Sequence, residues 1–381
     1  PTYLDKDAIF AYHFYRLAQR CKSFTLVYNT QTDAMGSGEK SRFIAQLENE
    51  LKQRYPNEIS FTKQVLSHPL HAVKPKELAV VKDIEIQKRL KEIATGRGFS
   101  PSSLNSYKNC PLQFYYEKVL KIRDPDVVEE TIAANTLGTV VHRSLEDLYK
   151  PFVNHLLTEQ DLKGMLPKIP AKLKELFSEE FKKGTFDKGK NLLVYTVAEQ
   201  FLNSFIKLEL KFLKNNELHI IGLEQDLKAE ITIDSLDFSI NLNGNADRID
   251  QCNGGLRITD YKTGMVNKNE LQTDDLELLV WDKSYQKGFQ LYLYAYLYHK
   301  MNPDQKELET GIVSFRALKN GFIPAGFKEG KQLTTLLDSS LLTDFEAEFK
   351  SLLVSIFDTT IPFHHKDRTE PCRFCDPQEF R

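Results

Sequence analysis

The stretch GNADRIDQCNGGLRITDYKTG, residues 244–264, constrains the fold of this chain more than any other. Polar residues alternate with apolar or small ones from Asn241 to Asp247, and a second apolar-rich run follows from Leu256. Alternation with a period of two is typical of a strand with one buried face. Asn253-Gly254 separates the two runs and is a strong hairpin turn signal. The stretch therefore predicts two antiparallel strands joined by a tight turn.

Three charged side chains stand in this hairpin, namely Asp247, Asp260 and Lys262. Pairing of the two strands brings the carboxylates together, and residues two apart on a strand share a face. Mg²⁺ prefers one or two carboxylates together with water and phosphate oxygens. The hairpin thus predicts a divalent metal site with a cation beside it.

The composition excludes several classes of protein. The 381 residues suffice for two or three domains, and 41% hydrophobic and 27% charged residues are ordinary for a globular protein. No apolar run reaches about 18 residues, so we expect no transmembrane helix. The N-terminus lacks the pattern of a signal peptide, which makes the cytoplasm the default location. A net charge of −2 does not indicate nucleic-acid binding by itself, although a local groove can supply phosphate contacts.

The chain divides at Gly96-Arg97-Gly98, which interrupts the helical pattern before it. Residues 1–95 predict a small α/β segment, with helices over 8–22 and 41–54 and a buried strand over 24–28. Residues 96–381 predict an α/β domain with a mixed sheet flanked by helices. Its strands are expected over 218–233 and 238–249, and its helices include 284–300 and 341–357.

Four further features of the second domain could carry function. A helix is expected from Ser100-Pro101, and Gly138 precedes His142 by four residues. Glu224 falls on a predicted strand, and Gln290 and Tyr294 share a face of the helix over 284–300. Each has a plainer interpretation. An isolated histidine more often caps a helix or lies on the surface, a strand glutamate is often exposed, and a tyrosine in such an apolar helix often packs in the core.

In order and spacing these motifs resemble the PD-(D/E)XK nucleases, and within them the RecB-like branch. Asp247 matches the first Asp of the motif, Asp260-Tyr261-Lys262 matches D-x-K, and Gln290-x-x-x-Tyr294 matches a motif typical of that branch. The run from Ser100 to Leu120 resembles the first helix of RecB-like and AddB nuclease domains. The resemblance covers residues 100–381 and implies a restriction-endonuclease-like core.

The resemblance also implies a chemistry, the metal-assisted hydrolysis of DNA phosphodiesters. His142, Asp247, Asp260 and the backbone carbonyl of Tyr261 would hold Mg²⁺ or Mn²⁺, and Glu224 would contribute to the same site. Lys262 would orient or activate water or neutralise charge in the transition state. Gln290 and Tyr294 would hydrogen-bond the lysine or a phosphate oxygen. A metal-independent enzyme with Lys262 as nucleophile is a further alternative, against which the adjacent carboxylates argue.

Five cysteines, an odd number, argue against a disulfide framework. Relatives with an iron–sulfur cluster use one cysteine in the first helix and three near the C-terminus. Cys110, Cys372 and Cys375 match three of these places, and residues 376–381 contain no fourth cysteine. His364 or His365 could complete a zinc site instead, since zinc accepts cysteine and histidine together. The alternative is a relic in which apolar packing holds the tail.

Residues 1–95 resemble the end of a degenerate UvrD-type helicase core of AddB-like proteins, with Arg16 and Arg20 in comparable places. The resemblance implies a fragment of a longer protein that processes broken DNA ends in recombinational repair with an AddA-like helicase-nuclease partner. A small packing domain is the alternative for this segment. For the whole chain, the alternative is a DNA-binding scaffold protein with weak or no nuclease activity.

Overall fold

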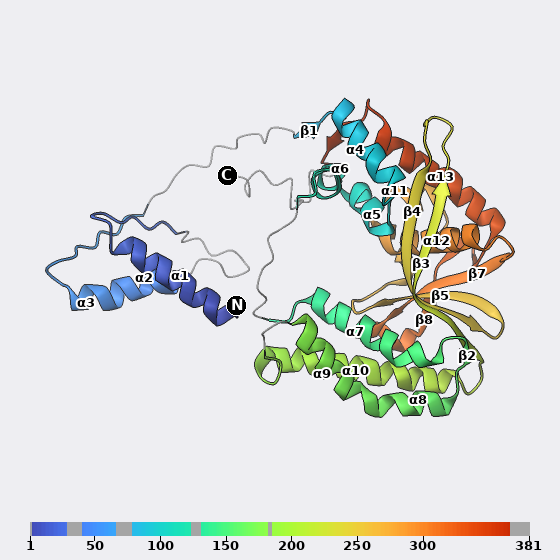
Figure 1. Ribbon diagram of the computed structural model, residues 1–381, viewed down its shortest axis with the longest axis horizontal. Helices are drawn as coiled ribbons and strands as arrows, with labels where there is room; N and C mark the ends of the chain where they lie inside the picture. Colours follow the sequence, from blue (N-terminus) through green and yellow to red (C-terminus); the bar gives the residue numbers. More distant parts are fainter. Residues whose placement is uncertain (1, 29–39, 66–77, 123–130, 182–184, 366–381) are drawn as a thin grey trace. The chain divides into compact units, whose positions relative to one another are not determined.

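The computed structural model describes residues 2–28, 40–65, 78–122, 131–181 and 185–365 (Figure 1). The chain forms two compact units. One lies within residues 1–74, and the other contains the described residues from 78 onward. This division lies closer to the N-terminus than the predicted boundary near residue 95, and the extent of the independently folded domain stays a prediction.

In the described part of the first unit, the regular secondary structure is helical. Its helices are α1 (Tyr3–Ala18), α2 (Arg42–Gln46) and α3 (Lys52–Arg54), with a π-helical turn over Leu47–Leu51 between the last two. Phe14 stacks on Phe43 at 5.1 Å between ring centroids. The strand predicted over residues 24–28 does not form. The segment has no strand partner among the described residues, and Val27 is 84% exposed rather than buried.

The second unit is built on a mixed seven-stranded sheet. Its strand order is β11-β7-β5-β4-β3-β2, with β8 paired to β7, and only the β5–β7 pair is parallel. The strands are β2 (His155–Leu156), β3 (Leu218–Ile231), β4 (Ile240–Cys252), β5 (Gly255–Lys262), β7 (Glu307–Ser314), β8 (Phe322–Pro324) and β11 (Leu336–Asp338). The predicted hairpin is confirmed as β4 and β5, with Asn253 and Gly254 at positive φ in its turn.

Helices cover both faces of this sheet (Figure 1). On one face lie α4 (Ile84–Thr95), α5 (Pro101–Asn109), α6 (Pro111–Phe114), α11 (Leu276–Trp281), α12 (Gln286–Met301) and α13 (Ser339–Phe357). On the other face lie α7 (Ala134–Tyr149), α8 (Glu159–Met165), α9 (Ile169–Glu180) and α10 (Gly189–Phe212). Neighbouring strand residues alternate between the two cores; Ile312 belongs to the first and Val313 to the second. The predicted mixed sheet flanked by helices is confirmed.

Short strands complete the second unit. They are β1 (Ala79–Val80) paired with β12 (Phe363–His364), and β6 (Gln272–Thr273), β9 (Gly326–Glu329) and β10 (Gln332–Thr334) in a three-stranded sheet. A π-helical turn over Tyr115–Val119 follows α6.

Helix α5 begins where the sequence predicts. The Ser100 side chain accepts a hydrogen bond from the Ser103 backbone N–H, and Pro101 stands at the first helical position. Asn105 Nδ2 donates to the Gln286 carbonyl (3.1 Å), and Tyr107 donates to the Ser355 carbonyl (2.9 Å). These bonds fix α5 against α12 and α13.

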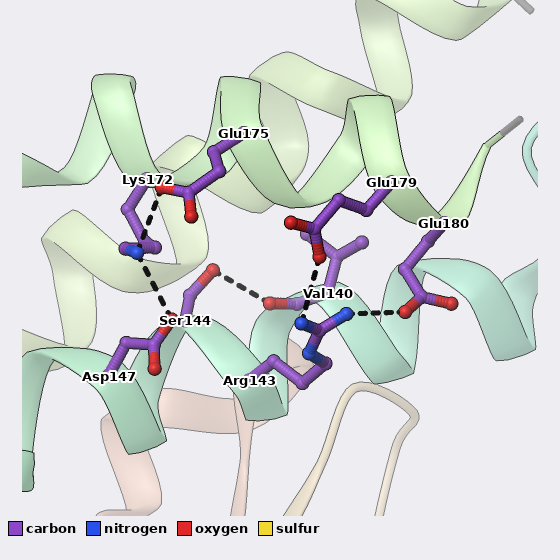
Figure 2. A network of polar contacts seen from close by, with 8 residues as sticks. All are labelled: Val140, Arg143, Ser144, Asp147, Lys172, Glu175, Glu179 and Glu180. Atoms are coloured by element: carbon purple, nitrogen blue, oxygen red, sulfur yellow. Dashed lines mark hydrogen bonds and ion pairs between the residues drawn. The ribbon is translucent and has the colours of Figure 1, made fainter.

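Helix α7, which carries His142, is held from outside by charged pairs to α9 (Figure 2). Arg143 lies 2.9 Å from Glu179 and 2.5 Å from Glu180, and Lys172 lies 3.2 Å from Asp147. All of these side chains are partly exposed. Exposed pairs of this kind each contribute about 0–1 kcal/mol, so packing of the α7 core face dominates its placement.

Candidate metal centre

The two strands of the hairpin separate at the predicted site. Their pairing runs from Cys252–Gly255 to Arg248–Thr259 and ends there. Beyond this point the Asp247 carboxylate accepts a hydrogen bond from the Tyr261 backbone N–H at 2.6 Å. The Asp247 side chain thus satisfies a backbone N–H of β5 that β4 no longer pairs, and this bond holds the Asp247 carboxylate next to β5.

Three side chains from three elements come together here. His142 of α7, Glu224 of β3 and Asp247 of β4 each offer one ligand atom, and these atoms lie within 4.8 Å of one another. His142 Nδ1 lies 3.4 Å from Asp247 Oδ2. Glu224 has a φ of +45°, a conformation that non-glycine residues rarely adopt and that clusters at functional sites.

Asp260, Lys262, Gln290 and Tyr294 form a second, adjoining group. Lys262 Nζ lies 2.7 Å from Asp260 Oδ2, and Gln290 Nε2 donates to Asp260 Oδ1 at 3.1 Å. The same amide nitrogen donates to the Tyr294 hydroxyl at 2.6 Å. Asp260 itself is 2% exposed and lies outside the group of three. Gln290 therefore contacts Asp260 and Tyr294, and its predicted contact with a phosphate oxygen stays a prediction.

Burial and crowded negative charge shift the ionisation of these groups. Burial, helped by the charge of Asp247, raises the pKa of Glu224 to about 7. Burial also raises the pKa of Asp260, opposed by Lys262 and reinforced by Asp247. Burial acts to lower the pKa of Lys262, but the attraction of Asp260 outweighs it and the pKa is raised. Three carboxyl groups thus share a space with one ammonium and one imidazole.

The chemistry of this donor set fits a divalent cation. Imidazole nitrogen and carboxylate oxygen are accepted by Mn²⁺, and carboxylate oxygen is the preferred protein ligand of Mg²⁺. A bound cation would also offset the carboxylate repulsion that raises these pKa values. The predicted role of the Tyr261 backbone carbonyl stays a prediction.

The sequence reasoning missed a buried charged network that lies farther along the hairpin, against α10. Arg248 lies 2.7 Å from Glu209 of α10 and 2.6 Å from Asp250, and its guanidinium donates to the Tyr261 hydroxyl at 3.1 Å. Arg257 lies 2.9 Å from Asp250. The alternation of Arg248 and Asp250 on one face was a visible signal for part of this network. The contribution of Glu209 comes from a distant helix and had no local signal.

Only part of the predicted cysteine site can be placed. Cys110 is 2% exposed, and its Sγ lies 3.3 Å from His365 Nδ1. His364 instead contacts the Pro362 carbonyl at 3.0 Å. Cys372 and Cys375 lie outside the described residues, and the choice between a cluster, zinc and a relic stays open.

Comparison with known proteins gives three findings. The family model of the PD-(D/E)XK nuclease superfamily matches residues 98–380. An ATP-dependent helicase/deoxyribonuclease subunit from Carboxydothermus hydrogenoformans is 27% identical over 202 residues, which are 48% of this chain and 18% of that protein. The solved structure of SSO0001 shares 16% identity over 56% of this chain and 85% of that chain, with a TM-score of 0.21 that is too low to bear on the fold.

Among the described residues, no helix has both the length and the apolar character that crossing a bilayer requires.

Proposed function

Because the chain belongs to the PD-(D/E)XK nuclease superfamily, we propose that it is a metal-dependent deoxyribonuclease that hydrolyses DNA phosphodiester bonds. The observation that carries the proposal is the meeting of His142, Glu224 and Asp247 beside the Asp260–Lys262 pair. These residues come from separate elements. Without a bound cation, three carboxyl groups lie close together with only one ammonium and one imidazole to offset their repulsion.

His142, Glu224 and Asp247 would hold Mg²⁺ or Mn²⁺, with Asp260 beside them. When bound, such an ion polarises a scissile phosphate and lowers the pKa of a bound water. The side chain of Lys262 is 29% exposed, so its ammonium can reach a phosphate while Asp260 holds it at 2.7 Å. There it orients water and adds positive charge where negative charge develops in the transition state.

Gln290 and Tyr294 support this arrangement. The Gln290 amide donates to both Asp260 and Tyr294, which fixes the direction of the Asp260 carboxylate. Burial raises the pKa of Tyr294 well above its usual range, so its hydroxyl stays protonated. The hydroxyl accepts from Gln290 and keeps its own proton to donate to a phosphate oxygen or water.

The relative from Carboxydothermus hydrogenoformans, whose name joins helicase and deoxyribonuclease, motivates the wider biological proposal. We infer that this chain acts in the processing of broken DNA ends for recombinational repair, beside an AddA-like helicase-nuclease partner, in the cytoplasm. The chain spans about a fifth of that relative's length, so the relative supports the role without carrying it over.

The test is cleavage of labelled linear single-stranded and double-stranded DNA in Mg²⁺ and in Mn²⁺. We expect metal-dependent cutting by the wild type and its loss in Lys262→Ala. Asp237→Asn is a matched control, because Asp237 is an exposed carboxylate between β3 and β4 that pairs with Lys91 at 3.0 Å. A wild-type protein that binds DNA but is inert with both metals would support the scaffold alternative instead.

A further inference from the structure

A recessed channel leads away from the metal centre on the α12 side of the sheet. Its first part is a cavity of about 480 Å³ lined by Gln290 and Tyr294 of the centre and by Arg97, Ser100 and Ser102. Its second part is a cavity of about 830 Å³ that shares Arg97, Ser100 and Ser102 with the first. The two cavities therefore adjoin, and we call them together the side channel.

The shared wall of the side channel is held rigidly to the sheet. Phe99 N donates to the Asn241 carbonyl, and Asn243 N donates to the Phe99 carbonyl, both at 2.9 Å. The Asn243 amide donates to the Arg97 carbonyl at 2.7 Å. Gly98 has a φ of +78°, and a Cβ there would clash with the Asn241 carbonyl oxygen. A glycine is required for this close approach, which fixes the backbone that presents Arg97.

The charge of the side channel suits a polyanion. Its larger part is lined by the basic residues Arg89, Arg97, Lys118 and Lys121 and by the acidic residues Glu92 and Glu117. Arg97 and Lys121 are exposed, and neither side chain makes a hydrogen bond or ion pair within the part of the chain that the structure describes. Two exposed cations in one channel contrast with the net charge of −2 for the whole chain.

We propose that the side channel holds the sugar-phosphate backbone of a single DNA strand on one side of the scissile phosphate, with Arg97 and Lys121 binding phosphates. This proposal rests on the proposed function, because it places the scissile phosphate beside Gln290 and Tyr294. A positively charged groove that follows the backbone is how proteins bind single strands without sequence preference. The channel is lined by α4, α5 and the turn after α6 on one side and by β4 on the other.

The test measures binding of a fluorescent oligothymidylate by anisotropy in EDTA, where no cleavage occurs. We compare the wild type, the double variant Arg97→Gln/Lys121→Gln and a control, Lys207→Gln/Lys211→Gln. The control removes two exposed lysines from α10, on the opposite face of the sheet. All four side chains are exposed, so none of the substitutions removes core packing.

We expect the double variant to bind about tenfold more weakly or worse, and its log–log salt slope to fall by about 1.4, which is roughly 0.7 for each lost phosphate contact. The control keeps wild-type affinity and slope. In the presence of metal, the KM for cleavage rises while kcat stays, because the lost contact is the same in the ground and transition states.

Unchanged affinity and salt slope in the double variant would overturn the proposal that the side channel binds DNA, and would leave the nuclease proposal standing. Binding that depends on Arg97 and Lys121 in a protein that never cleaves would support the side channel and overturn the nuclease proposal. Tighter binding of a duplex than of the single strand would overturn the assignment to one strand.

Discussion

Two charged clusters lie along the β4–β5 hairpin, and they are built differently. In the first, Arg248 and Arg257 balance Asp250 and Glu209, and each charged group has close partners. In the second, Glu224, Asp247 and Asp260 meet a single ammonium and one imidazole. Paired charges in the first cluster suit a structural role, whereas excess carboxylate in the second suits a site that a cation completes.

The largest effect on stability is expected at the cluster of Arg248, Arg257, Asp250 and Glu209, which we call the balanced cluster. Arg248→Leu removes the guanidinium that contacts both Glu209 and Asp250, so the buried Glu209 loses its cation and Asp250 keeps only Arg257. Removal of one member of a buried ion-pair network costs about 3–5 kcal/mol. Urea denaturation followed by circular dichroism measures the loss in the free energy of unfolding. Exposed ion pairs contribute at most about 1 kcal/mol. A smaller loss than this in the free energy of unfolding would contradict the structural role of the balanced cluster.

At the cluster of Glu224, Asp247 and Asp260, which we call the acid-rich cluster, a substitution is expected to affect cleavage rather than stability. Asp247→Asn removes a carboxylate from among like charges, so we expect the free energy of unfolding to stay or to rise. Cleavage is expected to fall by about 100-fold or more, the loss typical of removing one preorganised electrostatic group from an active site. The same denaturation experiment and a single-turnover cleavage assay check both expectations. Destabilisation as large as that of Arg248→Leu would show that Asp247 is a structural residue.

Metal affinity is expected to depend on pH through Glu224. Its pKa is raised to about 7, so the carboxyl is mostly protonated below that pH and must release a proton when it binds a cation. Mn²⁺ affinity should therefore rise about tenfold or more between about pH 6 and pH 8. Deprotonation of His142, whose pKa is raised by Asp247 against the effect of its burial, adds to the rise.

Glu224→Gln isolates this contribution. The variant has no proton to release at position 224, so only the His142 part of the pH dependence should remain. Calorimetric titration with Mn²⁺ at several pH values measures the two slopes. If Mn²⁺ affinity depends on pH equally in the wild type and the variant, Glu224 does not bind the metal.

The smallest effect is expected at the exposed charges of α7. Arg143→Gln breaks two pairs to α9, at Glu179 and Glu180, that are open to water (Figure 2). We expect a loss of at most about 1 kcal/mol in the free energy of unfolding and unchanged cleavage, because packing rather than these pairs holds His142 in place. Chemical denaturation and the cleavage assay measure both quantities. A drop in cleavage without a drop in stability would show that the pairs position His142.

Much of the site was predictable because its residues lie in local patterns. The Asn253-Gly254 turn fixes the hairpin, and the hairpin places Asp247 near Asp260. The spacing of Gln290 and Tyr294 places both on one face of α12. The helical spacing of residues 284–300 and 341–357 likewise predicted α12 and α13.

Other parts depend on tertiary structure and could not be predicted. The sequence motif shows Asp247, Asp250 and Asp260 as similar acids, and only their neighbours distinguish Asp250, which two arginines bind. The predicted strand over residues 24–28 failed because strand propensity needs a partner, which the first unit does not supply among its described residues. Arg97 stood out only as part of a domain break, since its position in the side channel depends on the close approach at Gly98.

The most direct test of the account is a count of Mn²⁺ ions bound by equilibrium dialysis to the wild type, Asp247→Asn and Asp237→Asn at a pH above the pKa of Glu224. The account predicts that the wild type and Asp237→Asn bind Mn²⁺ alike and that Asp247→Asn loses this binding while remaining folded. Equal binding by all three proteins, or no binding by the wild type, would contradict the claim that His142, Glu224 and Asp247 form a metal centre.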